Sequence, residues 1–348
     1  MQDRIDNPFR GRGLPGLGPL PISTTDGVAR LLSRCPVHNE TPLFEMPGLA
    51  RRAGVDRVSV KDERPRMGLG SFKALGAAHA IARAAAETVE GGDWARALEG
   101  HVFVTASAGN HGLSVAAGAR VFGARAVVFL ARTVPDSFAA ALAAKGAEPV
   151  RAGATYEESM EAAEKVATDN GWTLLSDSSW PGYTDWPRRV MEGYLQMAAE
   201  AVGQIAAPPT HVLLQAGVGG MAAAVAAHLR LVWGDAPRIV IIEPATAPAL
   251  LDSIRGERVV TSRGPPSCMG RLDCKTPSLI ALAGLSRDAD QFVTLADDEV
   301  EEAIRTLAAG GLETSPSGGA GLAALLCGLK LGPEARVLAF VTEGAVDG

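Results

Sequence analysis

The sequence predicts an α/β protein in which mostly parallel β-sheets are flanked by helices. Three observations lead to this fold class. Short apolar, β-branched runs alternate with helical stretches, and this order produces parallel sheets that are covered on both faces. The chain has 348 residues, which is about right for two lobes that share a cleft. Gly and Ala are abundant, and their small side chains allow helices and strands to pack closely.

The predicted elements follow one another along the chain. Residues 1–40, rich in Gly, Pro and Arg, are expected to form an irregular arm, and residues 39–43 are expected to turn into a helix-like stretch. Strands are predicted at residues 55–61, 101–105, 126–130, 148–151, 211–215, 238–242 and 336–341. Helices are predicted at residues 71–90, 113–121, 135–145, 156–170, 221–233, 297–309 and 318–329.

The composition excludes several classes of protein. The net charge of −6 leaves no broad basic surface for nucleic acid or an anionic membrane, so neither partner is expected. No apolar run reaches the roughly 18 residues of a membrane span, and the first residues lack the apolar core of a secretory signal. Four cysteines do not make a disulfide scaffold in a chain of this length. We therefore expect a cytoplasmic protein that acts on small molecules.

Three loops that contain glycine each follow a predicted strand and precede a helix. They are residues 68–73 (GLGSFK), 105–112 (TASAGNHG) and 216–221 (AGVGGM). The free N–H groups of such a turn suit a phosphate, although each loop taken alone also fits a tight turn. Lys73 ends the first loop and is one of only six lysines in the chain. Any chemistry that requires a primary amine therefore has few candidates.

Together and in this order, the segments SFK, SAGNHG and GVGG resemble the motifs of fold-type II enzymes that use pyridoxal phosphate (PLP). This superfamily includes serine/threonine dehydratases and cysteine synthases. Four further segments resemble those of diaminopropionate ammonia-lyases: residues 61–64 (KDER), 177–184 (DSSWPGYT), 267–274 (SCMGRLDC) and 342–344 (TEG). The resemblance covers roughly residues 39–348.

The resemblance implies how the chain is organised. It implies a large PLP-binding domain of residues 1–96 and 180–348, a small mobile domain of residues 97–179, and an active site between them. It also implies a homodimer. The cofactor forms a Schiff base with a lysine in this family, and Lys73 matches that lysine, with Phe72 shaping the turn before it.

The remaining cofactor contacts are implied by the same motifs. The backbone N–H groups of the GVGG loop are expected to hold the phosphate, and small residues there let the backbone approach it. Asn110 matches the residue that binds the cofactor's ring hydroxyl, although a turn residue is the alternative. Thr342 matches the hydroxyl residue that faces the pyridine nitrogen, and a plain strand residue is the alternative there. The four residues of the loop are Gly217, Val218, Gly219 and Gly220.

Asp177 is the implied acid/base carboxylate for an L-substrate, and capping of a helix is its alternative role. In a closed apolar site its pKa would be raised, which would suit proton transfer at neutral pH. Trp180 and Tyr183 are expected to wall off the substrate from water. Backbone donors around Ser107, Ala108 and Gly109 are expected to bind the substrate carboxylate.

Ala108 departs from the family pattern. Diaminopropionate lyases that accept both stereoisomers carry an Asp at this place, and serine racemases carry a Ser. Alanine does not transfer a proton, so we expect poor turnover of the D-isomer and little racemisation. Cys268 and Cys274 match a region where the ammonia-lyases have cysteines; they form either a disulfide or, as we favour for a cytoplasmic protein, two free thiols.

The predicted function is PLP-dependent β-elimination on an L-2-amino acid, with L-2,3-diaminopropionate giving pyruvate and ammonia as the first choice. Two alternatives use the same scaffold: a dehydratase of serine, threonine or another 3-hydroxy amino acid, and a synthase that replaces the β-substituent. A Rossmann-type NAD-binding protein rests on GVGG alone and lacks the full G-x-G-x-x-G pattern. A non-catalytic interaction protein is disfavoured because Lys73, Asn110 and Thr342 are all present. No metal site is expected.

Overall fold

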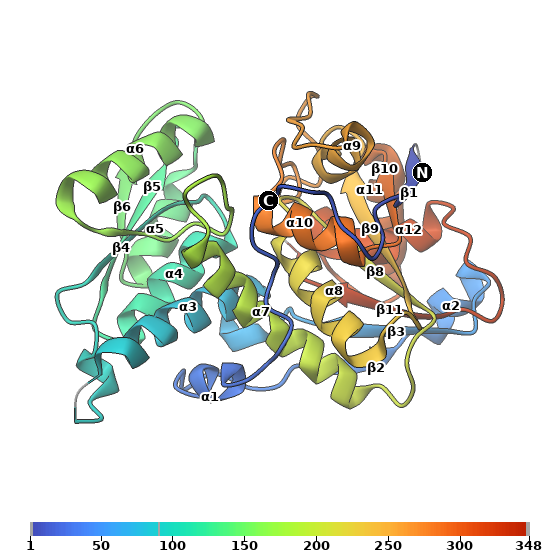
Figure 1. Ribbon diagram of the computed structural model, residues 1–348, viewed down its shortest axis with the longest axis horizontal. Coiled ribbons are helices and arrows are strands. Elements are labelled where there is room, and N and C mark those ends of the chain that lie inside the picture. Colours follow the sequence, from blue (N-terminus) through green and yellow to red (C-terminus); the bar gives the residue numbers. More distant parts are fainter. Residues whose placement is uncertain (1–2, 90, 346–348) are drawn as a thin grey trace.

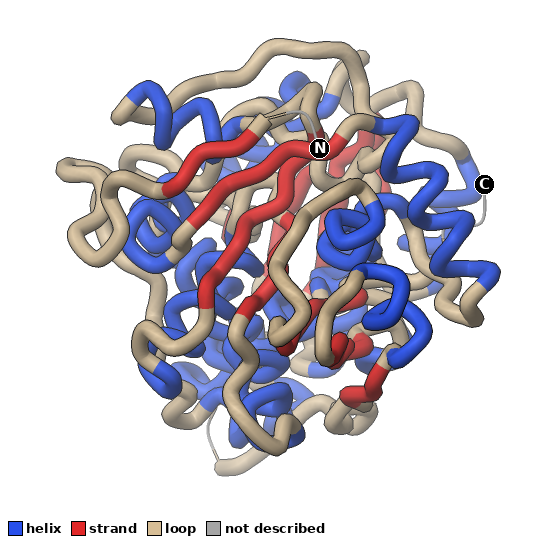
Figure 2. The backbone as a smooth tube through the Cα atoms, turned by 90° about the vertical axis from the view of Figure 1, so that its right-hand side faces the viewer, coloured by secondary structure: helices blue, strands red, loops and turns tan. Residues whose placement is uncertain are grey.

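The computed structural model describes residues 3–89 and 91–345, which form two lobes with one sheet each (Figure 1). The larger sheet has the strand order β1-β10-β9-β8-β11-β3-β2, and the smaller sheet has the order β6-β5-β4-β7. Figure 2 shows the strands of the large sheet side by side with helices around them. The strands are Arg4–Asp6 (β1), Leu43–Glu45 (β2), Arg57–Asp62 (β3), Val102–Ala106 (β4), Arg125–Leu130 (β5), Glu148–Arg151 (β6), Thr173–Leu174 (β7), His211–Gln215 (β8), Arg238–Pro244 (β9), Gln291–Leu295 (β10) and Arg336–Val341 (β11).

The predicted α/β class with mostly parallel sheets is confirmed. All neighbours in the small sheet are parallel, and so are the five central strands of the large sheet. Only the two edge strands of the large sheet, β1 and β2, run antiparallel to their neighbours. The central strands are buried along nearly their whole length, which explains their continuous apolar sequence.

Helices cover both sheets. They are Val28–Leu32 (α1), Pro47–Ala53 (α2), Lys73–Thr88 (α3), Asn110–Val121 (α4), Asp136–Ala144 (α5), Tyr156–Asn170 (α6), Asp185–Gln204 (α7), Gly220–Trp233 (α8), Ala249–Gly256 (α9), Leu279–Asp288 (α10), Asp297–Ala309 (α11) and Pro316–Leu326 (α12), with short 3₁₀ turns at Arg66–Gly68 and Trp94–Arg96. Within the described residues, no helix is long and apolar enough to cross a membrane.

Helices α3 and α7 pack closely where the two lobes meet (Figure 1). Gly193 of α7 makes this approach possible, because a Cβ there would lie 2.4 Å from the carbonyl oxygen of Leu75 in α3. The abundance of small residues therefore does serve close packing of helices, as the composition indicated. This contact fixes the start of α3, where Lys73 lies, relative to α7.

The structure differs from the sequence prediction in several places. The N-terminal arm is not wholly irregular, because β1 and α1 form within it. The helix-like stretch expected from residues 39–43 is wrong, since β2 follows there and α2 begins only at Pro47. Helix α7 and strand β10 were not predicted. The described residues leave out 1, 2, 90 and 346–348. Both outer ends of the predicted large domain and the last residue of the helix predicted at 71–90 therefore lie outside the described residues.

Residues 61–66 and α7 form a buried ionic network of Lys61, Glu63, Arg66 and Glu200. Glu200 of α7 accepts hydrogen bonds from Lys61 Nζ (2.7 Å) and Arg66 Nη2 (2.6 Å), and Arg66 Nε also pairs with Glu63 (2.7 Å). Burial opposes ionisation of Glu200, but the hydrogen bond and charge of Arg66, followed by those of Lys61, lower its pKa to about 2. The two cations and two carboxylates balance in charge, so the network ties β3 to α7 without a net buried charge.

Candidate active site

Lys73 is the first residue of α3 and is held against the end of β11. The Ser71 hydroxyl accepts the N–H of Lys73 (3.3 Å), and the N–H of Phe72 donates to the carbonyl of Thr342 (3.0 Å). Ser71 and Glu343 also form an isolated β-bridge. The structure therefore brings the segments SFK and TEG, separated by some 270 residues in sequence, into direct contact.

The Lys73 ammonium forms an ion pair with Asp177, which lies in the connection between the small lobe and α7. Burial alone would lower the pKa of Lys73, but the charge of Asp177 overcomes this effect and raises it. Burial would likewise raise the pKa of Asp177, but the charge of Lys73, followed by that of His111, holds it well below its usual range. The raised pKa expected for Asp177 is therefore wrong while Lys73 carries its charge.

Tyr194 of α7 lies next to this pair. Its ring packs against Phe72, with centroids 5.0 Å apart, and its side chain is only 1% exposed. Its hydroxyl has no hydrogen-bond partner in the described part of the chain, and burial raises its pKa, so it stays protonated. A buried hydroxyl without a partner marks a place where a bound molecule can accept a hydrogen bond.

The GVGG loop leads into the N-terminus of α8. Gly219 has φ +93°, a conformation that favours glycine. A Cβ at Gly217 would lie 2.9 Å from Cys274 Sγ and 3.0 Å from the Cα of Leu272. The need for glycine at this position therefore arises from the neighbouring segment 267–274, in addition to any approach to a phosphate.

The SAGNHG loop lies at the N-terminus of α4 in the small lobe. The Ser107 hydroxyl accepts the N–H groups of Gly109 (3.3 Å) and Gly112 (3.1 Å), so it shapes the loop. Ala108 is exposed. Asn110 Nδ2 donates to Glu343 Oε2 across the gap between the lobes (2.6 Å). The structure thus places Asn110 beside the end of β11, and its role in cofactor binding stays a prediction.

Thr342 is 4% exposed and follows β11 directly. Its hydroxyl accepts a hydrogen bond from Gln215 Nε2 (3.2 Å), the last residue of β8. Gln215 Nε2 also donates to the carbonyls of Gly318 (2.8 Å) and Phe340 (3.0 Å), which fixes the amide. Thr342 therefore stands at the carboxyl end of two parallel strands, where α/β sheets bind ligands.

Trp180 and Tyr183 stack on each other, with ring centroids 4.4 Å apart, and pack against the core of the small lobe. The Tyr183 hydroxyl donates to the carbonyl of Leu174 (2.8 Å) and accepts the N–H of Ser176 (3.0 Å). These bonds hold the backbone that leads to Asp177. The role of both aromatic residues as walls of the substrate site stays a prediction.

Cys268 and Cys274 are free thiols in the structure. Cys274 adjoins the GVGG loop, and burial raises the pKa of its thiol to about 11, so the thiol stays protonated. Cys268 instead lies beside Asp297, whose carboxylate accepts its backbone N–H (2.8 Å). The two cysteines thus have different surroundings.

Four residues of this region were not singled out from the sequence: Glu343, Arg271, Gln215 and Tyr194. Glu343 and Arg271 lie inside segments that resemble those of the ammonia-lyases, and this resemblance is the sequence feature that points to both residues. Arg271 Nη1 donates to Glu343 Oε1 (2.8 Å), and this pairing joins residues 72 positions apart. No local pattern predicts such a contact.

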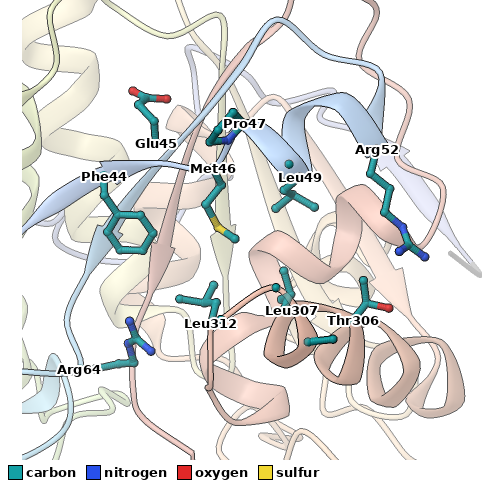
Figure 3. Close-up of a pocket in the computed structure, with 14 residues that line it drawn as sticks. Phe44, Glu45, Met46, Pro47, Leu49, Arg52, Arg64, Thr306, Leu307 and Leu312 are labelled. Carbon is teal, nitrogen blue, oxygen red and sulfur yellow. The ribbon is translucent and has the colours of Figure 1, made fainter.

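A separate cavity of about 510 Å³ opens in the large lobe between the β2–α2 segment and the end of α11 (Figure 3). Phe44, Met46, Leu49, Leu307 and Leu312 form much of its lining, and Arg52 and Arg64 lie at its edge. None of the predicted site residues lines it. In the described ranges, 3–89 and 91–345, no cluster of His, Cys, Asp and Glu has the arrangement of a metal site.

The residues around Lys73 fit pyridoxal phosphate. An amine stands at the lobe interface, a glycine loop opens the N-terminus of α8, and Thr342 offers a neutral hydroxyl at the strand ends. The unpartnered hydroxyl of Tyr194 adds a buried donor near the same helix start, since a Cβ at Gly220 would lie 4.0 Å from its ring. These donors suit a dianionic phosphate, and the lysine suits the cofactor's aldehyde.

Known proteins resemble this chain over most of its length. Residues 35–343 match the family model "Pyridoxal-phosphate dependent enzyme". Diaminopropionate ammonia-lyase of Escherichia coli K12 is 32% identical over 340 residues, covering 89% of this chain and 85% of that protein. A serine dehydratase-like protein of Mus musculus is 28% identical and covers 87% of each chain. The crystal structure of the E. coli diaminopropionate ammonia-lyase with D-serine superposes with a TM-score of 0.87 at 30% identity, covering 98% of this chain and 93% of that one. The predicted superfamily and its cofactor are thereby confirmed, and the chain belongs to the family of pyridoxal-phosphate-dependent enzymes.

Proposed function

We propose that this enzyme is an ammonia-lyase that eliminates the β-substituent of an L-2-amino acid, with L-2,3-diaminopropionate as its substrate. The similarity to diaminopropionate ammonia-lyases over nearly the whole chain supports this choice. The observation that carries it is the pairing of Lys73 with Asp177, because elimination of an amine requires both a base for the Cα proton and an acid for the leaving group.

The overall reaction consumes one water: L-2,3-diaminopropionate and water give pyruvate and two molecules of ammonia. Bound pyridoxal phosphate supplies the electron withdrawal that makes the Cα proton acidic. Lys73 would hold the cofactor, and as a free amine it would accept the Cα proton. Asp177 lies within reach of the same point and donates a proton to the departing β-amine.

The electrostatics of Asp177 support this role. Its pKa is low because Lys73 is charged, while its burial acts in the opposite direction. A neutral Lys73 amine, which the role of base requires, would no longer hold Asp177 in its charged form. The burial that remains then favours the protonated carboxyl, which is the form that an acid catalyst needs.

We assign the other roles on the same basis. Gly217–Gly220 bind the cofactor phosphate, Asn110 binds the ring hydroxyl, and Thr342 faces the ring nitrogen. Ser107, Ala108 and Gly109 surround the substrate carboxylate, while Trp180 and Tyr183 limit access of water. The domain boundaries at residues 96/97 and 179/180, a mobile small domain, a homodimer and a cytoplasmic location complete the proposal. The separate four-stranded sheet of the small lobe supports the division into domains.

A dehydratase of L-serine, L-threonine or a 3-hydroxy amino acid is the second candidate function. The similarity to the serine dehydratase-like protein favours it, and the same Lys73 and Asp177 would serve a hydroxyl leaving group. A synthase that replaces the β-substituent would use the same first half of the reaction.

The deciding experiment measures 2-oxo acid and ammonia with L-2,3-diaminopropionate, L-serine, L-threonine and L-3-hydroxyaspartate. We expect diaminopropionate to give the highest kcat/KM and two ammonia per pyruvate. The Lys73→Ala variant should lose both activity and the visible band of lysine-bound cofactor, whereas Lys330→Ala, at an exposed lysine, should keep both. If the enzyme prefers a hydroxy amino acid, the proposed function is the dehydratase and not the ammonia-lyase. A protein that never binds the cofactor would refute both proposed functions.

A further inference from the structure

Arg271 lies where the two lobes face each other. Its backbone N–H donates to the Ser317 hydroxyl (3.1 Å), which anchors the segment 267–274 to α12. Its Nη1 donates to Glu343 Oε1 (2.8 Å). On the other side, a Cβ placed on Gly109 of the small lobe would lie 3.7 Å from Arg271 Nε. The guanidinium group therefore sits between the end of β11 and the SAGNHG loop.

Most of the donors of this guanidinium group are free. No hydrogen bond from Nε or Nη2 is found to any residue in the ranges 3–89 and 91–345, and the side chain is 35% exposed. Glu343, by contrast, is 5% exposed and is also held by Asn110 and by the Ser315 hydroxyl. Glu343 thus fixes one edge of the guanidinium group and leaves the other available to a ligand.

The N-terminus of α4, which carries a partial positive charge, lies beside the same guanidinium group. Helix α4 has 12 residues and begins at Asn110; the Ser107 hydroxyl already accepts the N–H of Gly112 in its first turn, whereas Gly109 has no side chain that could cap the helix. The N-terminus of a helix of this length attracts anions through its free N–H groups and its dipole. A planar guanidinium group pairs with a carboxylate through two parallel hydrogen bonds. A carboxylate bound along the edge that Nε and Nη2 present, beside the start of α4, would accept hydrogen bonds from the guanidinium group and lie close to the helix N-terminus.

We propose that Arg271 is a substrate-binding residue that recognises a carboxylate of the amino acid through Nε and Nη2. This inference rests on the proposed function, which places the substrate beside the same loop. The carboxylate is either the α-carboxylate that every substrate has or a second carboxylate on the β-carbon, as in 3-hydroxyaspartate. In either case Arg271 contributes to binding and not to proton transfer, because a guanidinium group stays protonated.

The test compares Arg271→Gln and Arg271→Lys with the wild-type holoenzyme. Equilibrium binding is followed by the change in the visible cofactor spectrum on titration with L-alanine, which has one carboxylate and no leaving group, and with L-aspartate, which has two carboxylates. KM and kcat are measured with L-2,3-diaminopropionate. Arg255→Gln is the matched control, since Arg255 pairs with Asp3 at the surface, far from this loop in sequence and fold.

If Arg271 binds the α-carboxylate, we expect Arg271→Gln to weaken binding of both probes and to raise KM for L-2,3-diaminopropionate by roughly 10- to 100-fold, with kcat changed less than about threefold, and Arg271→Lys to restore part of the loss. If Arg271 binds a second carboxylate, KM for L-2,3-diaminopropionate stays unchanged, because this substrate has one carboxylate. Weaker binding of both probes assigns the α-carboxylate, and weaker binding of L-aspartate alone assigns a second carboxylate. Unchanged binding of both overturns the inference, even if elimination proceeds normally.

Failure of the proposed function gives a different result. Wild-type enzyme that binds the probes in an Arg271-dependent way but eliminates nothing would refute the ammonia-lyase and leave the role of Arg271 standing. If the holoenzyme binds neither probe, KM for L-2,3-diaminopropionate carries the test, and an unchanged KM in Arg271→Gln overturns the inference. If Arg271→Gln does not fold, Arg271→Lys, which keeps the charge, carries the test with a smaller expected loss.

Discussion

Substitution of Gly217 by Ala should weaken binding of pyridoxal phosphate without unfolding the protein. The added Cβ would lie 2.9 Å from Cys274 Sγ, 3.0 Å from Leu272 Cα and 3.2 Å from the carbonyl oxygen of Arg271. Two of these three atoms belong to the backbone, so they cannot move away by a change of rotamer. The loop itself must shift, and with it the N–H groups at the start of α8.

The size of the effect follows from this overlap. Overpacking of this kind costs about 1–3 kcal/mol. If the loop must adopt its original position to hold the phosphate, this free energy is subtracted from cofactor binding, which corresponds to a dissociation constant roughly 5- to 150-fold higher. The additional substitution Cys274→Ala should recover only part of the loss, because it removes the contact with Sγ and leaves those with the backbone.

The assay is titration of the apoprotein with pyridoxal phosphate, followed by visible absorbance, together with thermal unfolding with and without cofactor. Gly203→Ala is the matched control. Gly203 lies near the end of α7 with nothing within 4 Å of an added Cβ, so cofactor binding should not change. Its helix should gain up to about 1 kcal/mol. Wild-type cofactor affinity in Gly217→Ala would refute the argument from the loop geometry.

Three further changes test the assigned roles. Asp177→Asn should keep the visible cofactor band but lower kcat about 10²- to 10⁴-fold, as expected for the loss of an acid/base group. Ala108→Asp should raise turnover of D-2,3-diaminopropionate relative to the L-isomer, because it introduces a proton carrier beside the substrate loop. Glu200→Gln should destabilise the fold by about 3–5 kcal/mol in urea unfolding at pH 7, since it leaves Lys61 and Arg66 as buried cations with one carboxylate fewer. In the wild type, the stability from Glu200 is fully present above its ordinary pKa of 4.5 and is lost as the pH falls toward 2, so the variant should unfold with a weaker pH dependence in this window.

Each of these predictions has an outcome that contradicts it. An unchanged kcat in Asp177→Asn would exclude Asp177 as the acid, with Asp169→Asn at an exposed ion pair as the control. Equal wild-type rates for the two stereoisomers would remove the significance given to Ala108. Glu148→Gln, in an exposed pair with Arg125, should change stability by less than about 1 kcal/mol, and a similar small change in Glu200→Gln would mean that the buried network contributes little.

The parts of the site that depend on short segments were predictable from the sequence. Lys73 and the GVGG loop each lie where a strand turns into a helix, and the turn itself requires particular residues. The order of strands and helices likewise follows from local apolar patterns. Helix α7 was missed although Val190, Met191, Tyr194 and Leu195 recur at helical spacing.

The parts that depend on long-range contacts were not predictable. Glu343 joins Arg271 to Asn110 across the lobes, and no pattern in a single sequence indicates which distant residues will meet. The sequence predicts a raised pKa for Asp177 because it indicates burial of this residue. It does not indicate that the charge of Lys73 lies beside Asp177 and lowers that pKa. Burial and pairing act in opposite directions, so the sign of such a shift depends on geometry.

The four strands of the small sheet come from one uninterrupted stretch of chain, between β4 and β7, while the large sheet draws its strands from both sides of that stretch. The sheet of the small lobe is thus formed by one continuous segment of the chain. A recombination event at its two connections would exchange the whole SAGNHG loop at once and leave Lys73 and the start of α8 in place. Lys73 and the glycine loop proposed to hold the cofactor therefore lie outside the stretch of chain that carries Asn110 and the loop proposed to bind the substrate carboxylate.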